Sequence, residues 1–229
     1  MGLNHSPTIV TEGLVLYLDA ANIRSYPTAG NTWSDLSVIQ NVGELKNSPT
    51  FSSLNNGNFS FDGTDDMVIL PNNTALDTDT PTVEVWVKTN ATTQNGFWFE
   101  KGTVNTQYSL FQEGAGIQWR HNISGVGLTN LTTTTATYMN TTDWYQIVGT
   151  YTSGSRILYI NGTQVNSDGR TGTLSVNNGG MSVGVYGGYI GGRSYYYNGN
   201  LAICRVYNRV LTATEIKQNF DALRGRFGI

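Results

Sequence analysis

The chain has 229 residues with a formal net charge of −3, and only 13% of its residues are charged. A nucleic-acid-binding domain is expected to carry a basic stripe, and this sequence has none. No stretch approaches the ~18 consecutive apolar residues of a membrane span. We therefore expect no nucleic-acid partner and no membrane insertion.

Residue usage favours strands over helices. The chain holds 27 Gly and 13 Tyr, whereas the strong helix formers Lys and Glu are scarce. A chain of this length suits one large β-sandwich. We interpret residues 1–12 as an N-terminal lead segment and residues 13–229 as a single domain.

Apolar runs of strand length, separated by Gly, Asn and Pro turns, recur along the chain. The clearest is Val83–Lys88, in which alternate side chains share one face. Residues 156–165 form a predicted hairpin, because Asn161 and Gly162 accept the positive φ angles of a type I′ turn. Further strand signals lie at residues 14–18, 59–61, 67–70, 97–99, 108–111, 116–120, 144–151, 181–185, 189–190 and 201–207.

The C-terminal segment carries the one convincing helix signal. Thr212 and Glu215 have the spacing of a capping box, which satisfies free N–H groups at a helix start. An apolar stripe follows over Ile216–Leu223, and Gly225 suits the residue after a helix end. Many short strands and one terminal helix predict an all-β fold, a two-sheet antiparallel sandwich.

Several segments resemble the laminin-G-like subgroup of the concanavalin A-like lectin/glucanase superfamily, and they occur in that family's order. The resemblance spans about residues 13–220 and implies a jelly-roll sandwich. The segments that carry it are Phe59–Asp66, Thr82–Lys88, Trp144–Tyr151, Leu158–Gly162, Ile190–Gly192, Tyr197–Gly199, Arg205–Arg209 and Leu211–Ile216.

The two ends of the domain resemble virion structural proteins of aquatic tailed bacteriophages. The matching segments are Gly13–Asn22, Ser25–Pro27 and Phe220–Ile229. This resemblance implies a non-enzymatic virion surface protein, a capsid decoration, tail or fibre component. Its partners would be other virion proteins and surface glycans, and the role admits a homo-oligomer. The alternative is a stand-alone, soluble, lectin-like carbohydrate-binding protein.

The expected site of synthesis is a host cytoplasm, with the virion surface as the final location. The N-terminus shows neither the basic region nor the apolar region of a signal peptide. Cys204 is the only cysteine, so no intrachain disulfide forms. A chain without disulfides agrees with assembly in a reducing compartment.

The sequence argues against catalysis. Glycoside hydrolysis needs two carboxylates a few ångströms apart, which the glucanases of this superfamily carry on one strand as E-x-D-x-x-E. No such trio is present, and the two histidines, His5 and His121, lack a supporting motif. A polysaccharide hydrolase is the third hypothesis, and it would depend on Glu84 or Glu100.

Asp62, Asp65 and Asp66 form the best acidic cluster and the candidate metal site. Calcium binds several oxygen ligands, often carboxylates, and lectins of the resembled superfamily often use it. The alternative is a turn in which Asp side chains accept hydrogen bonds from nearby backbone N–H groups. Calcium is accordingly the only candidate cofactor.

Four side chains are candidates for carbohydrate or partner contact. Trp119 and Arg120 lie between Gly-rich turns, and Tyr195 and Tyr196 precede a third tyrosine. Three consecutive tyrosines cannot all enter one core, so at least one is expected at the surface. Aromatic rings pack on the C–H faces of sugars, while the alternative role is subunit contact or edge packing.

Overall fold

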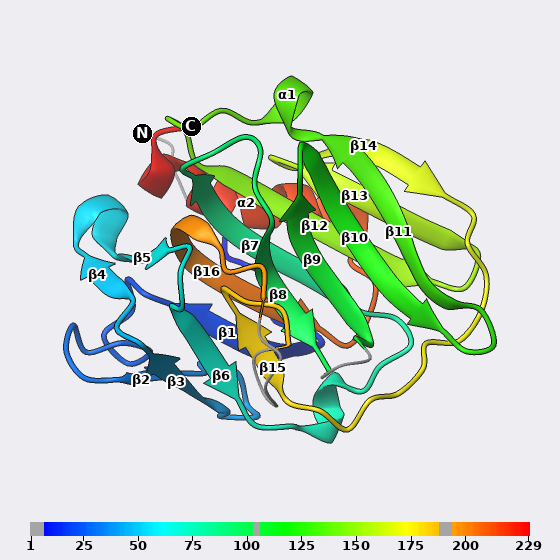
Figure 1. The fold of residues 1–229 in the computed structure, drawn as a ribbon, viewed down its shortest axis with the longest axis horizontal. Coiled ribbons are helices and arrows are strands. Elements are labelled where there is room, and N and C mark those ends of the chain that lie inside the picture. Colours follow the sequence, from blue (N-terminus) through cyan, green and yellow to red (C-terminus); the bar gives the residue numbers. More distant parts are fainter. Residues whose placement is uncertain (1–6, 103–105, 188–193) are drawn as a thin grey trace, which may run out of the picture.

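The computed structural model describes residues 7–102, 106–187 and 194–229, which form two packed antiparallel sheets (Figure 1). The back sheet, which carries the C-terminal helix, has the order β14 (Thr163–Asp168), β13 (Ser155–Ile160), β12 (Tyr145–Thr152), β7 (Thr82–Thr89), β16 (Asn198–Tyr207), β5 (Asn58–Asp62) and β4 (Thr50–Ser52). In addition, β1 (Leu14–Asp19) pairs with β16.

The front sheet lies over the opposite face of the core. Its order is β11 (Gly127–Thr134), β10 (Gly116–Ile123), β9 (Tyr108–Glu113), β8 (Gly96–Lys101), β15 (Met181–Val183), β6 (Met67–Leu70), β3 (Val42–Lys46) and β2 (Thr32–Ser34). Short helices η1 (Leu54–Asn56), η2 (Thr74–Leu76) and α1 (Thr135–Tyr138) occupy connections. The predicted two-sheet jelly-roll sandwich is confirmed.

The main core fills the space between the sheets. The predicted faces of β7 are confirmed, because Val83, Val85 and Val87 all enter this core. The hairpin turn is also confirmed: Asn161 and Gly162 have φ angles of 51° and 74°. The placement of the three valines follows from the two-residue repeat of a strand, which sends alternate side chains to opposite faces of the sheet.

The outer face of the back sheet is covered by α2 (Ala213–Phe227), which Figure 1 shows behind β7 and β12. The predicted capping box at its start is present. Trp86 stacks on Phe227 with ring centroids 4.4 Å apart. The expected helix end at Gly225 is wrong, because the helix continues and Gly228 adopts the left-handed cap at φ 74°.

A buried polar network joins α2 to the back sheet. Glu84 Oε1 accepts hydrogen bonds from Trp86 Nε1 at 2.9 Å, Gln146 Nε2 at 3.0 Å and Arg205 Nη1 at 3.1 Å. Its second oxygen accepts one from Asn219 Nδ2 of α2 at 2.8 Å. A buried charge is tolerated only when it is paired and hydrogen-bonded, so this network fixes where the helix docks.

Part of the predicted lead segment belongs to the packed domain. Val10 is buried, its N–H donates to Asn219 Oδ1 at 2.8 Å, and its carbonyl accepts from the Tyr207 hydroxyl at 3.0 Å. The carbonyl of Thr8 accepts from Gln218 at 2.7 Å. Residues 8 and 10 of the predicted lead segment thus contact α2 and β16, while the domain boundary at residue 13 stays a prediction.

Four strands have no counterpart in the sequence prediction, namely β2, β3, β4 and β11. The first three lie in the turn-rich stretch 22–58 and are three to five residues long, and β11 is an edge strand of the front sheet. The strand signal expected at residues 189–190 lies outside the described residues. Within the described part of the chain, no helix combines the length and apolar character that crossing a membrane requires.

Candidate functional site

The outer face of the front sheet carries two rows of side chains from neighbouring strands. Among the described residues, no helix covers this face as α2 covers the back sheet (Figure 1). The polar row consists of Ser182, Glu100, Ser109, Arg120 and Asn130, which are successive cross-strand partners. The second row beside it begins with two aromatic residues and ends with two polar ones, namely Phe97, Phe111, Gln118 and Thr132.

Arg120 lies where the two rows meet. Its guanidinium lies over the ring of Phe111 at 4.3 Å and near that of Phe97 at 5.8 Å, a cation–π arrangement. Its Nε donates to Asn130 Oδ1 at 3.0 Å, and Nη2 lies 3.9 Å from a carboxylate oxygen of Glu113. The side chain keeps 15% of its surface exposed, so a fixed cation faces solvent here.

Tyr195 is the exposed aromatic of this face. The residue is 45% exposed, and its ring stacks on Phe97 with centroids 6.3 Å apart and lies 6.1 Å from the ring of Tyr186. Its φ angle is 54°, a left-handed conformation that bulky residues rarely adopt. The Tyr195 carbonyl accepts a hydrogen bond from the N–H of Phe97 at 3.2 Å, which holds it in place. Such strain persists where the surroundings impose it, and it concentrates at functional positions.

The structure brings together two of the four predicted contact residues, Arg120 and Tyr195, around the ring of Phe97. The predicted surface contact by Trp119 is wrong, because this side chain is fully buried and its Nε1 donates to the carbonyl of Thr150 at 3.0 Å. Strand alternation sends Trp119 into the core whenever Arg120 faces outward. Tyr196 is half-buried and makes no ring contact within the described residues, so its role stays a prediction.

Glu100 is a carboxyl group buried beneath this face. Its Oε1 accepts a hydrogen bond from the Thr106 hydroxyl at 2.5 Å, and Oε2 accepts from the N–H of Gly187 at 2.7 Å. Burial raises the pKa of Glu100 to about 7, while these hydrogen bonds and the Arg120 charge oppose the rise. A carboxyl with a near-neutral pKa changes its charge within the physiological range.

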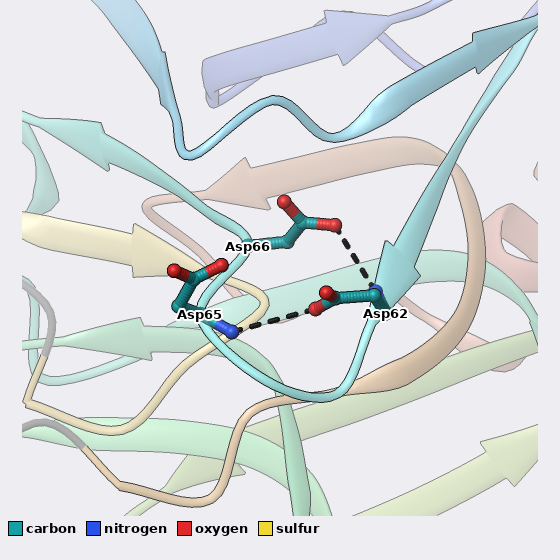
Figure 2. A group of neighbouring side chains, drawn as sticks. All are labelled: Asp62, Asp65 and Asp66. Atoms are coloured by element: carbon teal, nitrogen blue, oxygen red, sulfur yellow. Dashed lines mark hydrogen bonds between the residues drawn. The ribbon is translucent and has the colours of Figure 1, made fainter.

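The acidic cluster occupies the turn between β5 and β6, drawn in Figure 2. One oxygen each from Asp62, Asp65 and Asp66 lie within 4.8 Å of one another. Asp62 Oδ1 accepts from the N–H of Thr64 at 2.8 Å. Figure 2 shows two further bonds, from the N–H of Asp65 to Asp62 Oδ1 at 3.4 Å and from the N–H of Asp62 to Asp66 Oδ2 at 3.1 Å. The turn interpretation is thus realised in the structure, and it leaves other carboxylate oxygens available.

The donor set of this turn suits a hard cation such as calcium. Burial, reinforced by the neighbouring carboxylates of Asp62 and Asp65, raises the pKa of Asp66 to about 6. A bound cation would relieve the repulsion between these neighbouring carboxylates, and Ca²⁺ binds oxygen ligands of this kind. Asp62 and Asp65 are exposed, so an ion would reach them from solvent.

The two-sheet antiparallel sandwich with a helix on one outer face defines a concanavalin A-like class of protein. The family model described as the concanavalin A-like lectin/glucanases superfamily matches residues 62–217. The chain therefore belongs to this superfamily. No curated protein matches the chain by sequence.

Solved structures share the fold at low identity. The binding domain of botulinum neurotoxin DC in complex with rat synaptotagmin II aligns with a TM-score of 0.71 and 13% identity over 92% of this chain. The binding domain of paraclostridial mosquitocidal protein 1 gives 0.70 and 16% over 91%. This chain spans only 52% of the length of either structure.

Sequence reasoning missed several members of the site. Phe97 and Phe111 were recognised as strand residues, but not as the aromatic support of Arg120. Glu100 reaches the site from β8, and Tyr186 reaches it from the segment after β15. The sequence did offer a signal, namely the two aromatic segments that precede Arg120. It does not reveal the register in which their strands pair, so the contact with Arg120 could not be predicted.

Proposed function

We propose that the chain is a non-catalytic binding module whose contact surface is formed by Tyr195, Tyr186 and Arg120 on the front sheet. The observation that carries this proposal is Tyr195, an exposed aromatic residue in a strained backbone conformation, which stacks on Phe97 where the Arg120 guanidinium also lies. An aromatic face packs on the C–H face of a sugar, and a guanidinium fixes hydroxyl or carboxylate oxygens. Glycans are the proposed ligands.

The placement of the acidic residues supports a role without catalysis. Glu84 was one candidate for a hydrolase, but four donors surround it beneath α2. Glu100 was the other, and it is fully buried on the front sheet. Glycoside hydrolysis needs two carboxyl groups roughly 5–9.5 Å apart, both reaching the substrate. Glu84 and Glu100 lie on different sheets and cannot serve as that pair.

Calcium belongs to the proposal as an ion held by Asp62, Asp65 and Asp66. The crowded carboxylates of the turn support it. When bound, the ion would neutralise the cluster and stiffen the connection between β5 and β6, which lies beside Asn198 at the start of β16.

The biological setting we propose is the surface of a bacteriophage virion, as a capsid decoration, tail or fibre component. The resemblance of the two ends of the domain to phage virion proteins supports it. Co-sedimentation with assembled particles is the expected result, and a protein found only free in the lysate would contradict it. A stand-alone lectin is the second candidate, because the superfamily includes lectins.

The contact surface is tested by a glycan array probed with the purified chain, with and without calcium. Tyr195→Ala should reduce binding by about fivefold or more, since an aromatic stacking contact contributes ~1 kcal/mol or more. Leu54→Ala is the matched control, because Leu54 is 73% exposed but lies next to β4 of the back sheet. Equal binding by the wild type and the Tyr195 variant would refute this surface. No binding to any glycan would favour a protein contact.

A further inference from the structure

Glu100 lies on the outer face of a sheet, where side chains normally meet water, yet it is fully buried. Two described stretches, Val185–Gly187 and Ser194–Tyr195, lie over it and are called the cover below. They pair with each other: the N–H of Tyr186 donates to the Ser194 carbonyl at 3.0 Å, and the reverse bond measures 3.3 Å.

The cover is anchored to the sheet through the polar row. Glu100 Oε2 accepts the N–H of Gly187 at 2.7 Å, and the Ser182 hydroxyl donates to the Val185 carbonyl at 2.9 Å. Phe97 holds the other end through its N–H bond to Tyr195. The carboxyl of Glu100 is therefore the one ionisable group among these anchors.

The closed arrangement gives the Glu100 carboxylate two hydrogen-bond donors but no ion-pair partner, so burial outweighs them in setting its pKa. Within the described residues, the one charged group that acts on it is Arg120 of β10, while the tyrosines Tyr186 and Tyr195 of the cover face Arg120. Arg120 is shared with Glu113 and forms no ion pair with Glu100 within 4 Å. This follows from the sheet, because β9 lies between their two strands.

Ser109 is the residue between them, and its position reinforces the argument. Its hydroxyl oxygen is buried and has no hydrogen-bond partner within the described residues. A buried polar group without a partner costs free energy that water would recover. The closed arrangement thus leaves Ser109 without a partner at every pH, and it penalises Glu100 whenever that group is ionised.

We propose that Glu100 is a pH-sensitive latch, which holds the cover and Tyr195 against the front sheet when protonated and releases them when ionised. This inference rests on the proposed function, because the cover carries the aromatic ring of the contact surface. It adds regulation to that surface: the position of Tyr195 depends on the charge of a group that the ligand never touches.

The direction of the effect follows from linkage. The pKa of Glu100 is about 7 under the closed cover, against an ordinary value of 4.5. The closed state is therefore fully favoured below about pH 4.5 and loses stability as the pH rises to about 7. The difference between the two pKa values limits the change in the opening equilibrium to about 300-fold.

The test follows the backbone amide of Gly187 by ¹H–¹⁵N NMR from about pH 5 to about pH 9, without any ligand. The wild type should titrate with a midpoint near the Glu100 pKa of about 7. Glu100→Gln, which keeps the shape and cannot ionise, should remove that titration. Glu113→Gln is the control, because it removes an exposed carboxylate that also faces Arg120.

Hydrogen exchange of the cover, corrected for the intrinsic pH dependence of exchange, is the second readout. Exchange should accelerate with pH in the wild type and in the Glu113 variant, but not in Glu100→Gln. A Gly187 resonance insensitive to pH, or an unchanged midpoint in Glu100→Gln, would overturn the latch. Neither result involves a glycan, so the proposed function would stand or fall separately by the Tyr195 variant.

Discussion

Replacing Glu84 by glutamine should destabilise the fold strongly. Glu84 and Arg205 form an ion pair of 3.1 Å with both side chains fully buried. All four groups around the Glu84 carboxylate are donors, so the amide nitrogen of glutamine would oppose at least one of them. Removing one partner of a buried pair typically costs about 3–5 kcal/mol, because the other charge is left uncompensated.

Urea unfolding followed by tryptophan fluorescence measures this cost. With an m value of about 3 kcal/mol/M, the unfolding midpoint should fall by about 1–1.7 M. The control is Glu44→Gln, which breaks an exposed pair with Lys46 and should cost at most ~1 kcal/mol. A loss below ~1 kcal/mol in the Glu84 variant would refute the reasoning, since Arg205 would then have found another partner or water.

Two further predictions concern the core and the acidic turn. Gly149→Ala should destabilise the chain by about 1–3 kcal/mol, because a Cβ there would overlap the buried ring of Trp119. A thermal melt at or above the wild-type midpoint would show that the ring moves aside. Calcium affinity should fall as the pH drops below about 6, since Asp66, with its pKa of about 6, must lose its proton to bind the ion. Calorimetric titrations above and below that pH would show equal affinities if Asp66 is not a ligand.

The strand framework could be predicted because period-two alternation is written into the residues. Val83–Lys88 shows this, since its valines enter the main core while Glu84 and Trp86 face α2. The capping box of α2 was equally readable from Thr212 and Glu215. Short strands such as β3 were missed, since their few apolar residues lie among turn residues and gain their pairing from neighbouring strands.

The contact surface was only half predictable for a physical reason. Alternation says that Trp119 and Arg120 point to opposite faces, but it does not say which of the two faces the core. The irregular register between Phe97 and Phe99 also changes which aromatic residue of β8 faces outward. Tyr195 and Gly187 lie far from β8 in the sequence, and their hydrogen bonds to Phe97 and Glu100 are not revealed by any local pattern.

The most direct test of the central claim is to map the ligand footprint on the chain by NMR chemical-shift perturbation, using a glycan selected on the array. The surface defined by Tyr195, Tyr186 and Arg120 predicts that the largest shifts fall on those residues and on Phe97 beneath them. Shifts centred instead on the turn of Asp62 and its neighbours, with the front sheet unchanged, would contradict the account.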